Sequence, residues 1–178
     1  MRKALDLLYL WSGYLAAVFL VAIAATIIAQ IIGRFFGIAV DSTESAGFSL
    51  AGSTFLGLAY TFRNDGHIRV TLLTRLARGW VVKLIEIWSV GFCILIMGIF
   101  TYWAFDLVYF SYVFNDLSPG LLAVPFWIPR LAMALGALIL TIALIDELIG
   151  ILAGKTPSYV ANSTAIFAKV DDDPAEAK

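Results

Sequence analysis

The chain has 178 residues, of which 61% are hydrophobic and 14% charged, and its mean hydropathy is +0.91. A soluble core of this length cannot bury so much apolar surface, so the composition indicates an integral membrane protein. The formal net charge of −1 lacks the basic excess that nucleic-acid binding requires. With one cysteine and one histidine, the chain cannot form an internal disulfide or hold a haem between two of its own histidines.

Four apolar segments are long enough to cross a bilayer as helices, which takes about 20 residues each. Their approximate ranges are 5–32, 45–62, 81–110 and 124–152. The second segment is the least apolar, because it is rich in Gly, Ser, Ala and Thr. We therefore expect an all-α integral membrane protein with one four-helix domain over 1–155. The acidic tail over 156–178 is expected to be disordered and cytoplasmic.

The basic residues predict the orientation of these four helices. Ten of the 12 Lys and Arg residues lie at the two ends of the chain or in the connection after the second span, which four spans place on one side. The other side carries Arg34 and Arg130. Because cytoplasmic loops are enriched in Lys and Arg, both termini are predicted to be cytoplasmic.

Small residues spaced by four mark one face of the second span: Ser45, Ser49, Ser53, Gly57 and Thr61. Such a face lets another helix approach closely. It fits packing within the chain's own bundle or docking against a different protein, and the spacing does not separate the two. Glu44 comes just before this span, where it fits either a capping charge at a helix N-terminus or a polar contact with a partner subunit.

The connection after the second span combines a turn with an amphipathic stretch. Asn and Asp before Gly66 are turn residues, and His67 fits a structural role in this turn better than a catalytic one. Over 68–79, apolar residues fall on one helical face and polar or basic residues on the other, with Arg69 near the start as an exception. We expect a short interfacial helix whose arginines meet lipid headgroups, namely Arg69, Arg75 and Arg78. The alternative is an irregular loop with ordinary cytoplasmic charges.

Three functional classes of membrane protein are possible for such a chain: an enzyme, an autonomous transporter and a structural protein. An enzyme would need a nucleophile and a base within reach, and no such pair is evident, so no catalytic, cofactor-binding or metal-ligating residue is assigned. An autonomous transporter would normally keep an ionisable residue at mid-membrane depth, whereas the centres of all four spans lack one. A structural membrane protein with an unrelated partner shares nearly every feature of the chain.

Several residues together resemble a known family motif. They are Glu44, the Leu-Gly element at Gly57, Arg63, and the turn Gly66, His67, Ile68 and Arg69. This pattern is similar to the small permease (Q, DctQ-like) subunit of tripartite ATP-independent periplasmic (TRAP) transporters, as are the length and the four spans. Two positions depart from the family pattern. The family commonly has an aromatic residue midway between the Glu and the Leu-Gly element, where this sequence has no aromatic residue over 50–54, and Thr71 stands where an Asp is common.

The resemblance implies a subunit of a secondary, sodium-coupled transporter for organic acids, such as carboxylates, in the bacterial inner membrane. It implies a large permease (M) subunit as partner, and a periplasmic substrate-binding protein acting through the complex. This chain would brace the large subunit as part of a static scaffold, with no substrate site and no cofactor. Membrane lipids are the other expected partner.

Overall fold

The structure is a computed structural model that describes residues 2–38, 42–63, 80–120 and 123–153. These residues form four α-helices: α1 (Arg2–Phe35), α2 (Thr43–Arg63), α4 (Trp80–Val113) and α5 (Trp127–Leu152). No strand occurs in these ranges, so the expected all-helical fold is confirmed for them. The expected interfacial helix over 68–79, the turn residues Gly66 to Arg69, Arg75, Arg78 and the tail lie outside the described residues.

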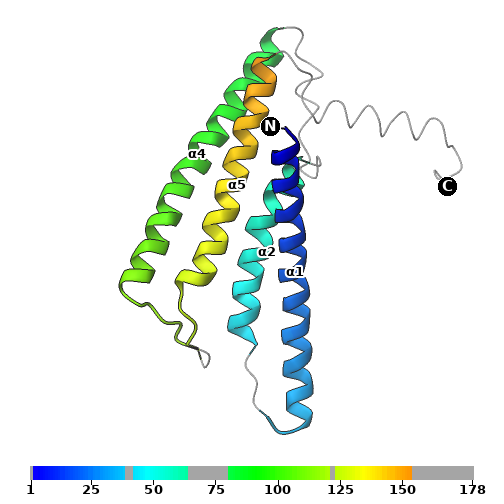
Figure 1. Ribbon diagram of the computed structural model, residues 1–178, viewed down its shortest axis with the longest axis vertical. Coiled ribbons are helices and arrows are strands. Elements are labelled where there is room, and N and C mark those ends of the chain that lie inside the picture. Colours follow the sequence, from blue (N-terminus) through cyan, green and yellow to red (C-terminus); the bar gives the residue numbers. More distant parts are fainter. Residues whose placement is uncertain (1, 39–41, 64–79, 121–122, 154–178) are drawn as a thin grey trace, which may run out of the picture.

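The helices form an open row rather than a closed bundle. α1 packs on α2, α2 on α5, and α5 on α4, so the spatial order is α1–α2–α5–α4 (Figure 1). The two helices at the ends of the row, α1 and α4, share no substantial interface. An open row leaves two broad faces uncovered, and large apolar side chains of its helices are exposed, such as Trp11 at 64% and Trp88 at 73%.

Three of the described helices are long and apolar enough to cross a membrane: Leu5–Phe35, Lys83–Val113 and Trp127–Leu152. α2 has 21 residues and lies between α1 and α5, which supplies a physical reason for its lower hydropathy. Protein covers two of its sides, so fewer of its side chains would have to be compatible with lipid.

Local hydrogen bonds account for two of the helix ends. α1 ends in a Schellman motif, in which the Ile38 N–H donates to the Gly33 carbonyl and the Gly37 N–H to the Arg34 carbonyl. Gly37 has a positive φ of 72°, which favours glycine at this position. α5 begins at Trp127 rather than at 124, because the Val124 carbonyl accepts a hydrogen bond from the Ser118 N–H within the preceding connection.

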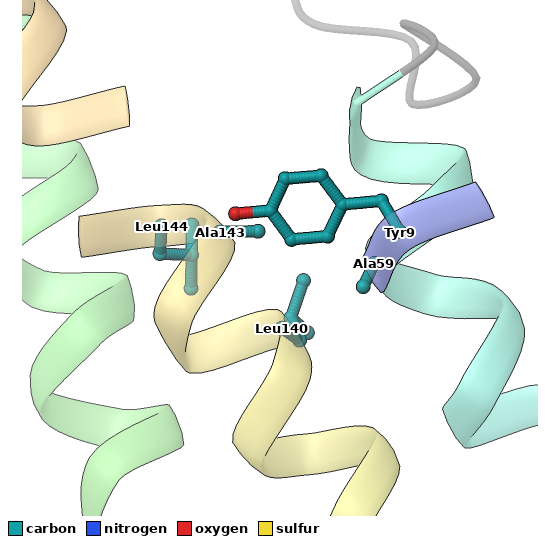
Figure 2. Close-up of a cluster of buried hydrophobic side chains, with 5 residues drawn as sticks. All are labelled: Tyr9, Ala59, Leu140, Ala143 and Leu144. Carbon is teal, nitrogen blue, oxygen red and sulfur yellow. The ribbon is translucent and has the colours of Figure 1, made fainter. Parts of the chain in front are cut away.

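The buried core lies where α1, α2 and α5 meet. It consists of Tyr9, Ala59, Leu140, Ala143 and Leu144 (Figure 2). The alanines allow the helix axes to approach, and the Tyr9 ring reaches from α1 across to α5, with its hydroxyl beside Ala143 and Leu144 (Figure 2). α4 joins the row through the hydroxyl contact of Thr101 with Thr141 at 3.2 Å and the stacked rings of Phe55 and Phe100.

Candidate functional site

Arg63, the last residue of α2, lies at the centre of an ionic cluster that ties three helices together. One guanidinium nitrogen is 3.5 Å from an Asp6 carboxylate oxygen on α1. The other is 3.6 Å from Asp146 and 3.8 Å from Glu147, both on α5. These distances exceed the usual N–H···O range, so the contacts are ion pairs rather than hydrogen bonds. The cluster fixes α1, α2 and α5 relative to one another at the level where α2 ends.

Exposure is graded across this cluster. The Glu147 side chain is 7% exposed, Asp146 20%, Arg63 27% and Asp6 55%. A buried carboxylate is costly without an opposite charge, so Arg63 compensates the burial of Glu147 while Asp6 faces the surface. Arg63 was predicted as a family-motif residue, but the gathering of its three partners was not foreseen. The available signal was the presence of ionisable residues at the same ends of apolar helices.

A cavity of about 290 Å³ opens beside Arg63. It is lined by residues of α1 and α2, namely Asp6, Tyr9, Leu10, Tyr60 and Arg63. Tyr9 is 2% exposed, and its hydroxyl has no hydrogen-bond partner among the described residues. The cavity is therefore lined by a carboxylate, a guanidinium and two tyrosines, while the Tyr9 hydroxyl itself is buried beside α5 (Figure 2).

Glu44 lies in the first turn of α2 and packs against Gly120 in the connection between α4 and α5. A Cβ atom at residue 120 would come within 2.9 Å of the Glu44 Oε1 and still closer to its other carboxylate atoms. The Oε2 atom is buried and has no hydrogen-bond partner in the described ranges. Glu44 therefore also forms a tertiary contact, which its position at a helix N-terminus did not predict.

The connection that carries Gly120 is held in place by its own contacts. The Arg130 guanidinium lies 3.3 Å from the Asp116 carboxylate and 4.8 Å from the centre of the Phe126 ring. The Phe126 ring in turn meets Phe48 of α2 edge to face, with 5.8 Å between centroids. At this end too, α2 is tied to the α4–α5 pair, so both ends of α2 are fixed.

The five small residues that were predicted to mark one face of α2 are half-buried in the structure, namely Ser45, Ser49, Ser53, Gly57 and Thr61. A Cβ atom at Gly57 would lie 3.6 Å from the Ala16 side chain of α1, so this part of the face packs within the chain. The Ser45 and Thr61 hydroxyls donate to backbone carbonyls of Ser42 and Gly57. A close approach between α2 and α5 lies elsewhere, at Gly136 of α5, where an added Cβ would meet the backbone of Phe55, and the spacing in α2 did not indicate it.

Comparisons with known proteins give one match. The family model described as "Tripartite ATP-independent periplasmic transporters, DctQ component" matches residues 23–154, which include the C-terminal part of α1 and all of α2, α4 and α5. This match confirms the resemblance that the sequence motif predicts. It covers a transporter component rather than an enzyme family. No curated protein and no solved structure matches the chain.

Proposed function

Because the chain belongs to the DctQ component family of TRAP transporters, we propose that it braces a large permease subunit as part of a static scaffold. The family identifies the chain as a small membrane subunit of such a transporter, and DctQ proteins work with a large permease, DctM, and a substrate-binding protein. In this proposal the transporter is secondary and sodium-coupled, carries organic acids such as carboxylates, and lies in the bacterial inner membrane.

The open row of helices is the observation that best supports a bracing role. A row with two uncovered apolar faces presents far more contact area to a partner than a closed bundle of the same helices. α2 is also fixed to its neighbours at both of its own ends. The ion pairs of Arg63 hold its C-terminus, and the Phe48–Phe126 and Glu44–Gly120 contacts hold its N-terminal part. A broad, internally cross-linked surface suits a part that holds still while its partner moves.

The placement of charge supports the absence of a substrate site in this chain. In the described helices, the charged residues lie near the helix ends, as Asp6, Arg63, Arg130 and Asp146 do. An organic acid at mid-membrane depth would need a cationic or polar site there. We therefore place the substrate and sodium sites in the large subunit. In the same proposal, α2 crosses the membrane with the other three helices and both termini are cytoplasmic.

Co-purification tests this assignment. The full-length chain carries a C-terminal tag, is extracted in mild detergent, and the co-purifying proteins are identified by mass spectrometry. We expect a many-span permease in stoichiometric amount, and uptake into vesicles only when both subunits and a cognate binding protein are present. A chain that purifies alone, intact and monodisperse, would contradict the bracing role. Substrate flux into vesicles that contain this chain alone would instead establish an autonomous transporter.

A further inference from the structure

We propose that a membrane helix of the large permease subunit docks on the outward side of α4, and that Asp106 pairs with a basic side chain of that helix. This inference rests on the proposed bracing role and assigns its contact surface. α4 is one of the two end helices of the row, and in the described part of the chain no helix packs on the side turned away from α5 (Figure 1).

A regular seam of large side chains runs along this side of α4. The buried residues Val90, Ala104 and Ser111 fall on one side of the helix, as expected for the contact with α5. The opposite side carries residues spaced alternately by four and three: Trp88, Phe92, Leu95, Ile99, Tyr102 and Asp106. The five large residues of this seam are 51–73% exposed. This spacing is the one by which two helices pack side by side along their length.

The composition of the seam favours protein over lipid as its neighbour. On α1, the other end helix, every exposed large apolar side chain over 15–32 is aliphatic, which suits lipid tails. On α4, Tyr102 lies about 8 Å along the axis from the helix midpoint, whereas aromatic belts at the lipid surface lie about 15 Å from the bilayer centre. Aromatic side chains are enriched in the contact surfaces between proteins. We therefore assign α4 to the partner and α1 to lipid.

Asp106 supplies the charge that identifies the partner. It lies seven residues before Val113, farther from a helix end than any other charged residue of the described helices. Its side chain is partly exposed, and no described residue forms an ion pair or hydrogen bond with its carboxylate. A short Asp side chain cannot extend along the helix to water as Lys and Arg do. An opposite charge on a neighbouring helix is the usual compensation for such a group.

The same carboxylate disfavours a second copy of this chain as the occupant. Two copies inserted in the same orientation and packed symmetrically through this seam would bring their Asp106 carboxylates to the same level, where like charges repel. A different helix with Lys or Arg at this level turns the repulsion into an attraction. A single polar residue in a helical seam also fixes the register of the two helices.

Photo-crosslinking in the assembled transporter tests the surface. The full-length chain is co-expressed with its cognate large permease, and p-benzoylphenylalanine replaces Ile99 of α4 or Val21 of α1. Both positions are exposed and lie equally close to the midpoints of their helices. We expect an adduct with the large subunit from residue 99, and none above background from residue 21.

Asp106→Asn tests the charge in the same complex. It should speed the loss of the large subunit from the immobilised complex at least about tenfold, the effect of removing one member of a desolvated charge pair. Asp116→Asn is the matched control, because this carboxylate pairs with Arg130 of the same chain, and it should leave the rate unchanged. Asp106→Asn should also leave the unfolding temperature of the isolated chain unchanged, since no described residue pairs with Asp106.

Four results would overturn this inference alone. They are adducts from residue 21 but not from residue 99, adducts that join two copies of this chain through residue 99, an unchanged dissociation rate in Asp106→Asn, and a lower unfolding temperature of that variant in isolation. The last result would assign the carboxylate to the chain's own structure. If the wild-type chain captures no large permease at all, the bracing role fails as well, so the two failures can be told apart.

Discussion

Gly136 of α5 lies directly against the main chain of Phe55 in α2. A Cβ atom at residue 136 would come within 2.6 Å of the Phe55 carbonyl oxygen and 2.8 Å of the Leu56 nitrogen. The neighbouring atoms belong to backbone, which cannot move aside as a flexible side chain can. This contact joins the α1–α2 pair to the α4–α5 pair through an approach that requires glycine.

Replacing Gly136 by alanine should therefore destabilise the chain. We expect a loss of about 1–3 kcal/mol in the free energy of unfolding, the usual cost of forcing extra volume into a packed interface. Gly150→Ala is the matched control on the same helix, because a Cβ there meets nothing within 4 Å. It should be neutral or slightly stabilising, since glycine in a helix costs about 0.5–1 kcal/mol relative to alanine. Equal effects of the two changes in denaturant titrations would refute the close approach of α2 and α5.

Removing the positive charge of Arg63 should be strongly destabilising. Arg63→Met leaves Glu147, whose side chain is 7% exposed, without this charge partner, and we expect a loss of about 3 kcal/mol in unfolding free energy. The double variant Arg63→Met/Glu147→Gln should recover part of the loss, because the amide carries no charge to bury. Thermal unfolding of the purified variants measures both.

Arg130→Met is the control for Arg63→Met. Its partner Asp116 has a side chain that is 48% exposed, so breaking this pair should cost no more than about 1 kcal/mol. A larger effect at Arg130 than at Arg63 would mean that the cluster on α1, α2 and α5 does not stabilise the row.

The contact between Glu44 and Gly120 predicts strong coupling between these two positions. Gly120→Ala should destabilise the wild-type chain, because the new methyl group would collide with the Glu44 carboxylate. In a Glu44→Ala background the same change should be nearly neutral. The coupling energy from a double-mutant cycle should fall in the range of about 0.5–3 kcal/mol found for residues in contact. Additive effects would show that the carboxylate does not pack on residue 120.

Cysteine labelling tests the four crossings and their orientation. Cys93 is first replaced by alanine, and single cysteines are then placed at Phe36, Asn115 or Ala153, which are exposed at helix ends. If all four helices cross, an impermeant maleimide should label residues 36 and 115 from the periplasmic side and leave residue 153 unlabelled until the membrane is opened. Labelling of residues 36 and 115 from opposite sides would show that α2 does not cross.

The sequence predicted where the helices lie in the chain better than it predicted which helices pack against one another. Long apolar runs reveal helices directly, and each expected range overlaps one observed helix, including α2 with its weak hydropathy. The order in the row could not be predicted, because it depends on the contact of Gly136 with Phe55, and these residues are far apart in the chain. Small residues occur in several spans, and their spacing does not say which pair will meet.

The residues of the candidate site were likewise predicted only in part. Arg63 was found because it belongs to a local motif, whereas Asp6 and Asp146 belong to none. Their role depends on three helix ends converging. Similarly, the position of Glu44 at the start of α2 predicted either a capping charge or a polar contact with a partner subunit, but not its contact with Gly120. The available signal for the Arg63 cluster was the presence of opposite charges at the ends of helices that lie on the same side.

The order of the row also constrains the order of synthesis. α2 is the least apolar of the described helices, and its second neighbour, α5, is the last of them to leave the ribosome. Until α5 emerges, the backbone around Phe55 lacks its contact with Gly136, and Arg63 lacks its ion pairs with α5. If α2 crosses the membrane as proposed, α1 alone shields it during this interval, and the α1–α2 hairpin must persist in the bilayer as a half-covered intermediate that α5 completes.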